Sequence, residues 1–187
     1  FVMIGDLNGA LAEQEAKRLG ARAAAAAVDV RVEAEIEALV EAAVRRFGRL
    51  DIAVQSAGLA SFSPLVDQSE EQWDTVLDVC LKGVFLCMKH AARRMRAQGQ
   101  GGVLLNIASL NAFQPGEGLS AYCAAKAGVE MLTRVGAMEL GADRIRVCGI
   151  APGLIETPLT AAARAVPAVR EGYLENIPLG RAGTAAD

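Results

Sequence analysis

Short apolar runs alternate with longer amphipathic stretches along the whole chain, and no other feature of the sequence constrains the fold as strongly. Short apolar runs indicate buried strands, whereas apolar residues three and four positions apart indicate helices. Strands that alternate with helices predict parallel strands joined by right-handed crossovers. We therefore expect an α/β fold in which helices cover both faces of a doubly wound, mostly parallel sheet.

The pattern predicts strands over residues 1–5, 23–28, 51–55, 102–107 and 145–150. It predicts helices over residues 8–20, 32–47, 69–98, 120–140, 158–164 and 167–176. Asn8 is a suitable N-cap for the first helix, and Ser69 with Gln72 forms a capping box at the start of the third. Gly83 lies in the middle of that third helix, where we expect a bend or a point of close packing.

Length and charge are those of one ordinary globular domain. The 187 residues suffice for a single domain with a real core. The 19 basic residues are spread along helices without interleaved aromatic residues, and the net charge is −3, so nucleic acid is not an expected partner. No apolar run reaches the roughly 18 residues that a membrane span requires, so we expect no membrane association.

The cysteines and the histidine indicate neither a disulfide framework nor a metal site. The cysteines lack a C-x-x-C pair, which favours reduced thiols in a cytoplasmic protein. They are Cys80, Cys87, Cys123 and Cys148. The single histidine, His90, lies among basic residues of a predicted helix, and we interpret it as a surface residue.

Polar or small residues follow the predicted strands where each strand ends. The carboxyl ends of parallel strands meet at one edge of a sheet, and ligands bind there. The residues at these positions are Asp6, Asp29, Ser56, Ala57, Gly58, Ser109, Pro152 and Gly153. Their convergence predicts one binding site at this edge.

Tyr122 and Lys126 lie four residues apart on a predicted helix, so both side chains point to the same face. An ammonium about 4 Å from a phenol, at an effective dielectric near 20, would favour the phenolate by about 4 kcal/mol. That effect would lower the tyrosine pKa by roughly three units and allow proton exchange with a substrate hydroxyl or carbonyl. An isolated pair at this spacing can also be a plain surface pair. Ser109, thirteen residues before Tyr122, could hold the substrate oxygen, although a lone serine more often caps a turn.

With these residues in register, the sequence resembles the short-chain dehydrogenase/reductase family over almost its whole length. The matching positions, in chain order, are Asp29-Val30, Gln55-Ser56-Ala57-Gly58, Ser109, Tyr122 to Lys126 in Tyr-Cys-Ala-Ala-Lys, Pro152-Gly153 and Thr157. The resemblance implies a Rossmann-like fold and hydride transfer between a nicotinamide cofactor and a substrate. By themselves, Pro152 and Gly153 could equally form a plain turn after a strand.

The resemblance also implies a role for each matching residue. Tyr122 would be the general acid when a ketone is reduced and the general base when an alcohol is oxidised. Lys126 would lower the tyrosine pKa and bind the nicotinamide ribose, and Ser109 would orient the substrate oxygen. The cofactor-binding residues would be Asp6, Leu7, Asp29, Val30, Ser56, Ala57, Gly58, Tyr122, Lys126, Pro152, Gly153, Ile155 and Thr157.

Asp6 ends the first predicted strand, where the family's second strand meets the adenosine ribose. A carboxylate there accepts hydrogen bonds from both ribose hydroxyls and repels a 2′-phosphate. Its neighbours Leu7 and Asn8 supply no arginine for that phosphate. We therefore expect NAD as the cofactor and regard NADP as the less favoured alternative, although Asp6 could also merely help to cap the following helix.

The sequence departs from the family pattern at three places. The chain opens inside an apolar run at Phe1, after the expected position of the family's glycine-rich turn. We thus expect residues 1–187 to be a single dinucleotide-binding and catalytic domain without its first strand, that turn and its last strand, and with a gap in the sheet. Gln55 and Ser56 replace two asparagines. Cys80 stands where the family has a fourth catalytic residue, an asparagine. A thiol cannot reproduce the amide's hydrogen bonds, so we expect weaker preorganisation, unless Cys80 is simply a small buried residue.

The sequence therefore predicts an oxidoreductase that transfers a hydride between NAD(H) and a small, largely apolar alcohol or ketone. Residues 59–66, 110–118 and 154–178 would enclose that substrate. The alternative is a non-catalytic dinucleotide-binding or scaffold protein of the same fold, which the changes at Cys80, Gln55 and Ser56 motivate. The resemblance further implies a homo-oligomer, a dimer or a tetramer.

Overall fold

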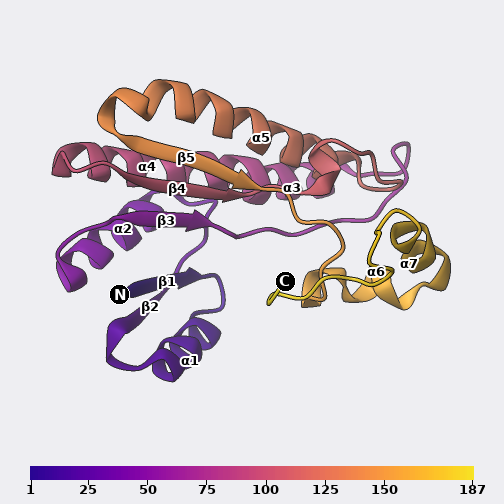
Figure 1. Ribbon diagram of the computed structural model, residues 1–187, viewed down its shortest axis with the longest axis horizontal. Helices are drawn as coiled ribbons and strands as arrows, with labels where there is room; N and C mark the ends of the chain where they lie inside the picture. Colours follow the sequence, from indigo (N-terminus) through magenta and orange to yellow (C-terminus); the bar gives the residue numbers. More distant parts are fainter.

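The structure is a computed structural model that describes residues 1–187, except for the side chains of Ala163 and Ala168. Its strands are β1 (Val2–Asp6), β2 (Ala23–Ala27), β3 (Ile52–Gln55), β4 (Gly102–Ile107) and β5 (Ile145–Ile150). Its α-helices are α1 (Gly9–Leu19), α2 (Glu33–Phe47), α3 (Glu70–Leu77), α4 (Gly83–Gln98), α5 (Ser120–Leu140), α6 (Ala161–Ala165) and α7 (Pro167–Leu174). Strands and helices alternate, and the expected α/β class is confirmed (Figure 1).

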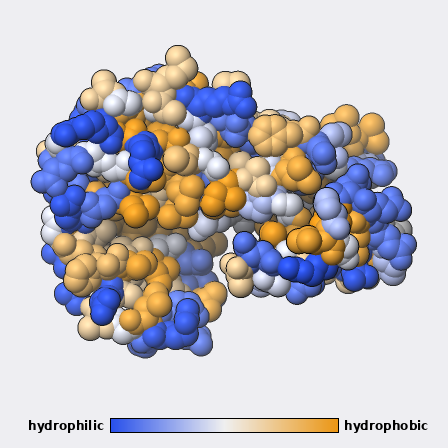
Figure 2. Space-filling model, in the orientation of Figure 1, coloured by the Kyte–Doolittle hydropathy of each residue, from blue (hydrophilic) through white to orange (hydrophobic). Residues whose placement is uncertain are grey.

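The strands form two parallel sheets with a slot between them. β1 pairs with β2, while β3, β4 and β5 pair in that order. Residues of β1 and β3 line opposite sides of the slot, which has a volume of about 710 Å³. Figure 2 shows apolar side chains along this recess, and the exposed Val2, Ile52 and Val54 belong to its two strands. The facing edges of β1 and β3 have no strand partner among the described residues.

Helices lie on both faces of the sheet as a whole, as the sequence predicts. The chain steps from β1 to β2 in one direction and from β3 to β5 in the opposite direction. Right-handed crossovers therefore place α1 on one face and α2, α4 and α5 on the other. Within the described chain no helix covers the α1 side of β3–β5, where Val54 and Ile150 are half exposed.

Local capping chemistry sets the helix ends where the sequence predicts them. The Asn8 Oδ1 accepts the Leu11 N–H at 3.1 Å at the start of α1. Ser69 and Gln72 form the expected reciprocal capping box at the start of α3, which satisfies two backbone donors that the helix itself cannot pair.

The predicted helix over residues 69–98 is not continuous. A π-helical turn, Asp78–Lys82, separates α3 from α4. Gly83 follows this turn, and a Cβ atom there would lie only 2.8 Å from the Val30 Cγ2. The expected close-packing point is thus confirmed, because glycine lets α4 approach the loop after β2. The wider turn presents Cys80 fully buried toward the carboxyl ends of the strands.

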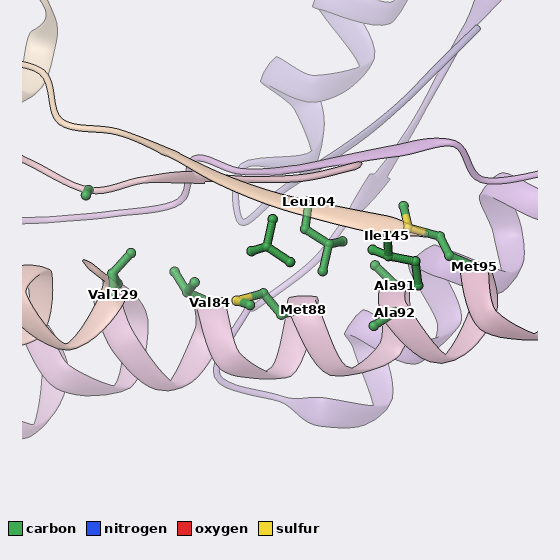
Figure 3. Close-up of a cluster of buried hydrophobic side chains, with 10 residues drawn as sticks. Val84, Met88, Ala91, Ala92, Met95, Leu104, Val129 and Ile145 are labelled. Atoms are coloured by element: carbon green, nitrogen blue, oxygen red, sulfur yellow. The ribbon is translucent and has the colours of Figure 1, made fainter. Parts of the chain in front are cut away.

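The main hydrophobic core lies between the three-stranded sheet and the helices α4 and α5. Figure 3 shows Met95 of α4 beside Leu104 and Ile145, which come from β4 and β5. All three side chains are almost fully buried. A smaller cluster of Val28, Ile36 and Leu86 joins the loop after β2 to α2 and α4.

The interpretation of His90 as a surface residue is wrong. His90 is only 7% exposed, and its Nε2 lies 2.9 Å from the Glu33 Oε1 of α2. Lys89 donates to the same carboxylate oxygen at 2.6 Å. The helix pattern of α4 alone did not reveal that α2 packs along it and supplies an acidic partner at this position. The Glu33 side chain, which contacts both Lys89 and His90, is half exposed.

The chain after β5 forms a separate, mostly exposed layer. A parallel bridge pairs Ile155 with Gly183, so the stretch that contains α6 and α7 starts and ends at the same place. Its helices begin close to where the sequence predicts them, at Pro158 and Pro167. None of the helices in the described part of the chain is long and apolar enough to cross a membrane.

Candidate active site

Lys126 stands on the buried face of α5, beneath the end of β4. Its side chain is 4% exposed, and its Nζ donates to the Ile107 carbonyl at 2.7 Å. Burial lowers the pKa of the Lys126 ammonium, while the neighbouring Cys80 acts in the opposite direction. The ammonium is thus fixed by the sheet rather than held in solvent.

Tyr122 lies one helical turn before Lys126, as its spacing predicts, and its ring centroid is 5.7 Å from the Lys126 Nζ. Burial raises the pKa of Tyr122, and a hydrogen bond with Ser109 partly offsets this effect. The expectation that Lys126 brings this pKa close to neutrality is therefore wrong for the structure. The ammonium donates to a backbone carbonyl instead of the phenol, and burial is the largest influence on this pKa.

Ser109 combines the two roles that the sequence left open. It is the N-cap of a short 3-10 turn, Leu110–Ala112, where its Oγ accepts the Asn111 N–H at 3.1 Å. It is also 6% exposed, and its hydroxyl lowers the pKa of Tyr122 against the larger effect of burial. Asn111, which the sequence reasoning missed, places its Oδ1 3.5 Å from the same hydroxyl. Its position two residues after Ser109, in a turn that caps itself, could have indicated it.

The turn after β3 brings backbone close to Lys126. A Cβ atom on Gly58 would lie 3.8 Å from both the Lys126 Nζ and the Cys80 Sγ. Gly58 thus leaves open a space directly beside the buried ammonium. Ser56 and Ala57 precede it as exposed residues and line the slot between the sheets.

Gln55, at the end of β3, has a structural explanation. In the amide orientation that satisfies hydrogen bonding, its Nε2 donates to the Asn106 Oδ1 at 2.9 Å and to the Leu105 carbonyl at 2.8 Å. Asn106 in turn donates to the Thr133 Oγ1 at 2.9 Å. These buried amides tie β3 and β4 to α5 immediately beneath the site.

Cys80 makes more hydrogen bonds than its residue type predicts. Its Sγ accepts the Leu59 N–H at 3.3 Å and donates to the Leu59 carbonyl at 3.2 Å. Cys80 is thus a buried residue that also makes polar contacts, and the expected weaker preorganisation stays a prediction. The π-helical turn brings Cys80 close enough for both contacts with one residue.

The residues expected around the adenosine lie at the ends of β1 and β2. The Asp6 Oδ1 accepts the Asn8 N–H at 2.8 Å, so Asp6 does support the helix start, and Leu7 beside it is 71% exposed. Asp29 binds Arg31 through both carboxylate oxygens, and this hydrogen bonding lowers the pKa of Asp29. Sequence reasoning missed Arg31, although an acid and a base two residues apart in a turn are a recognisable pair.

The remaining residues expected to bind the cofactor follow β5. The Pro152 carbonyl accepts the Leu110 N–H at 2.9 Å, so this loop lies against the turn that holds Ser109. A Cβ atom on Gly153 would meet nothing within 4 Å. Ile155 is in the bridge to Gly183, and Thr157 caps the short helix that begins at Pro158.

The structure therefore brings some of the expected site residues together and leaves others apart. Ser109, Tyr122, Lys126 and Gly58 form one connected cluster. The residues expected around the adenosine lie across the slot from this cluster. The lining of the slot includes Val30, Ser56 and Ala57. Open space at Gly58 and Gly153 and the exposed carboxylate of Asp6 fit a long, polar cofactor laid along the strand ends. Among the described residues, no three His, Cys, Asp or Glu side chains lie together so that they could hold a metal ion.

The family model that matches this chain is described as "Enoyl-(Acyl carrier protein) reductase" and covers residues 1–187. Two curated relatives are a 2-dehydro-3-deoxy-D-gluconate 5-dehydrogenase from Escherichia coli and a 3-oxoacyl-(acyl-carrier-protein) reductase from Thermotoga maritima. The first is 40% identical over 145 residues, 78% of this chain and 57% of that protein. The second is 40% identical over 140 residues, 75% of this chain and 56% of that protein. The chain spans about half the length of the curated relatives it matches.

A solved structure of similar fold is a gluconate 5-dehydrogenase from Burkholderia cenocepacia in complex with NADP and tartrate. It superposes with a TM-score of 0.91 and 31% identity, and the match covers 97% of this chain and 72% of that one. Both the sequence and the structure comparisons thus lead to dehydrogenases and reductases.

Proposed function

The chain belongs to the short-chain dehydrogenase/reductase family, and from this premise we propose that it transfers a hydride between a nicotinamide cofactor and a small alcohol or ketone. The observation that carries the proposal is the buried cluster of Ser109, Tyr122 and Lys126 at the end of β4. Tyr122 exchanges the proton of the substrate oxygen. The cofactor supplies or accepts the hydride when it is bound.

The electrostatics of the cluster suit Tyr122 to act as the acid that protonates a ketone oxygen at neutral pH. Because burial raises the pKa of Tyr122, its hydroxyl keeps a proton that it can donate to a carbonyl oxygen. Ser109 supplies a second polar contact for that oxygen. Lys126 is held by the Ile107 carbonyl, so its charge stays in place when negative charge develops on Tyr122 or on the substrate oxygen.

The residues that would hold the cofactor lie along the strand ends. Asp6 and Leu7 would meet the adenosine ribose, and Asp29 and Val30 the adenine. Ser56, Ala57 and Gly58 would line the middle of the cofactor, and Lys126 and Tyr122 its nicotinamide ribose. Ile155 and Thr157 would hold the carboxamide, and Pro152 and Gly153 would also contact the cofactor.

NAD is the proposed cofactor, with NADP as the alternative. The exposed carboxylate of Asp6 supports NAD because it repels a 2′-phosphate. The solved relative named above was bound to NADP, so the comparison does not favour NAD. Titration of the full-length protein with NADH and NADPH, followed by nicotinamide fluorescence, separates the two. We expect tighter binding of NADH; tighter binding of NADPH would overturn this choice.

The proposed substrate is a small, largely apolar molecule. The loops expected to enclose it carry exposed apolar side chains, among them Phe62, Leu65, Phe113 and Leu159. Two relatives are named for gluconate-type substrates, which are polar. A panel of apolar ketones and sugar acids, assayed by NADH consumption or formation, tests this choice. Turnover of the sugar acids alone would contradict an apolar site.

Tyr122→Phe tests the whole proposal. The substitution keeps the ring and removes the hydroxyl that exchanges the proton, so we expect turnover to fall by roughly 10²–10⁴-fold. NADH binding should change little, because the ring and Lys126 remain. Both quantities are measured on the same preparation, and unchanged turnover would refute the role of Tyr122. NADH binding by the wild type without turnover of any alcohol or ketone would instead favour the scaffold alternative.

We also propose that the protein is a homo-oligomer. Helices α4 and α5 expose the apolar side chains of Phe85, Met131 and Met138, which a second copy could cover. Sedimentation of the full-length protein gives the oligomeric state directly, and a monomer at micromolar concentration would exclude this assembly.

A further inference from the structure

We propose that Cys80 is a positioning residue, whose thiol holds the turn after β3 against the buried Lys126. The inference rests on the proposed function, because the turn matters through its place beside the proton-transfer residues. It also assigns a role to the position at which the chain departs most clearly from its family.

The Cys80 thiol makes two hydrogen bonds with one residue of the turn, Leu59. The Cys80 Sγ accepts the Leu59 N–H at 3.3 Å and donates to the Leu59 carbonyl at 3.2 Å. Both distances are within the range for hydrogen bonds that involve sulfur. Cys80 itself is fully buried, with Val76, Ala121 and Ala125 around it. The thiol therefore cannot move without a change in the packing of α3 and α5.

Few other hydrogen bonds fix the position of this turn. In the part of the chain that the structure describes, residues 57–62 take part in two hydrogen bonds. Both are between Leu59 and the Cys80 thiol. The next backbone bond along the chain is from the Ser63 N–H to the Gly118 carbonyl. Gly58 lies on the exposed side of this stretch. Its position therefore depends on Leu59 and hence on the thiol.

The position of Gly58 determines what surrounds Lys126. A Cβ atom on Gly58 would be 3.8 Å from the Lys126 Nζ and 3.8 Å from the Cys80 Sγ, so the three groups meet at one point. If the turn moved outward, water would reach the ammonium and screen its charge. The surroundings of Lys126 and of the neighbouring Tyr122 would then change, and with them the pH at which the tyrosine loses its proton.

We call the two hydrogen bonds between Cys80 and Leu59 the clamp. Three variants of the full-length protein test it. Cys80→Ala removes both hydrogen bonds, whereas Cys80→Ser retains a group that can donate and accept. Cys87→Ala is the matched control, because Cys87 is a mostly buried thiol of α4 for which the described residues provide no hydrogen bond. For each variant, kcat, KM and the pH dependence of alcohol oxidation are measured, together with amide hydrogen exchange at Leu59.

We expect Cys80→Ala to lower kcat about tenfold, to speed exchange at Leu59 and to shift the acid limb of the pH profile. Cys80→Ser should restore most of all three properties, and Cys87→Ala should leave the pH profile unchanged. Equal effects of Cys80→Ala and Cys87→Ala, or an unchanged pH profile in Cys80→Ala, would overturn the clamp.

The result can be separated from that of the proposed function. If the wild type has no turnover, the proposed function fails, but exchange at Leu59 and the affinity for NADH still report on the turn. In that case, faster exchange and weaker NADH binding in Cys80→Ala, with rescue by Cys80→Ser, would support the clamp. Exchange that is the same in wild type and Cys80→Ala would refute it.

Discussion

The two parts of the sheet differ in how firmly they hold their share of the site. The three-stranded part, β3–β5 with α4 and α5, encloses the large core and carries Ser109 and Lys126 as buried residues. The two-stranded part, β1–β2 with α1, has a small cluster and an open edge on the slot, and it carries Asp6 and Leu7 as exposed residues. Proton transfer needs distances fixed by packing, whereas contacts to an extended ligand can be made by surface groups.

The helices α2 and α4 join these parts. Glu33 at the start of α2 binds Lys89 and His90 of α4, and Val30 packs against Gly83. The cohesion of the two parts thus depends on few contacts. Substitutions at matched positions should therefore have different effects in each part.

Leu104→Ala should cause the largest loss of stability. Leu104 is fully buried between β4 and the helices, where the core cannot collapse, and we expect a loss of about 3–5 kcal/mol in the free energy of unfolding. The matched change Ile36→Ala lies in the small cluster with Val28 and Leu86, where fewer contacts are lost, so we expect about 2 kcal/mol. Denaturant unfolding monitored by circular dichroism measures both. Equal losses would contradict the difference between the two parts.

Gly83→Ala should have an intermediate effect on stability and a clear effect on the cofactor. The new methyl would meet the Val30 Cγ2 at 2.8 Å and the Val30 carbonyl oxygen at 3.3 Å, so the loop after β2 must shift. We expect a loss of about 1–3 kcal/mol and weaker NADH binding, with kcat at saturating NADH nearly unchanged. Gly141→Ala is a control, because a Cβ atom there meets nothing within 4 Å. A fall in kcat with unchanged NADH affinity would show that the two parts are not separable in this way.

Glu33→Gln should have the smallest effect, and only over part of the pH range. Two hydrogen bonds lower the pKa of Glu33 from 4.5 to about 2. The one from Lys89 has the larger effect and the one from His90 the smaller. A lowered carboxyl pKa stabilises the fold above pH 4.5, and this contribution is lost as the pH falls toward 2. The Tm of the wild type should therefore exceed that of Glu33→Gln at pH 6, and the difference should disappear near pH 2. A difference that is constant with pH would rule out this linkage.

Features that depend on neighbouring residues in the sequence could be predicted. The caps at Asn8 and Ser69 and the bounds of α5 agree with the pattern, because hydrogen bonds within four residues determine them. The meeting of Ser109, Tyr122 and Lys126 was also predictable, since parallel strands place their carboxyl ends together. The proton exchange that these residue types suggest is the part of the prediction that Tyr122→Phe would test.

Features that depend on contacts distant in sequence could not be predicted. His90 is buried because α2 brings Glu33 to it, and these residues are far apart in the chain. Cys80 reaches Leu59 because a π-helical turn replaces the expected continuous helix. Arg31 and Asn111 are a different case: each lies two residues from its partner, so the sequence held the signal, and it was missed because Asp29 and Ser109 were each considered alone.

The sequence by itself determined the α/β class, the order of the strands along the chain and the type of chemistry that Tyr122 and Lys126 can perform. Periodicity, caps and residue type are local properties, and they are read from short stretches of chain. Only the tertiary structure decided the direction of the Tyr122 pKa shift, the partner of Lys126 and the burial of His90 against Glu33. Burial and distance decide these properties, and both arise only when elements far apart in the chain are packed together.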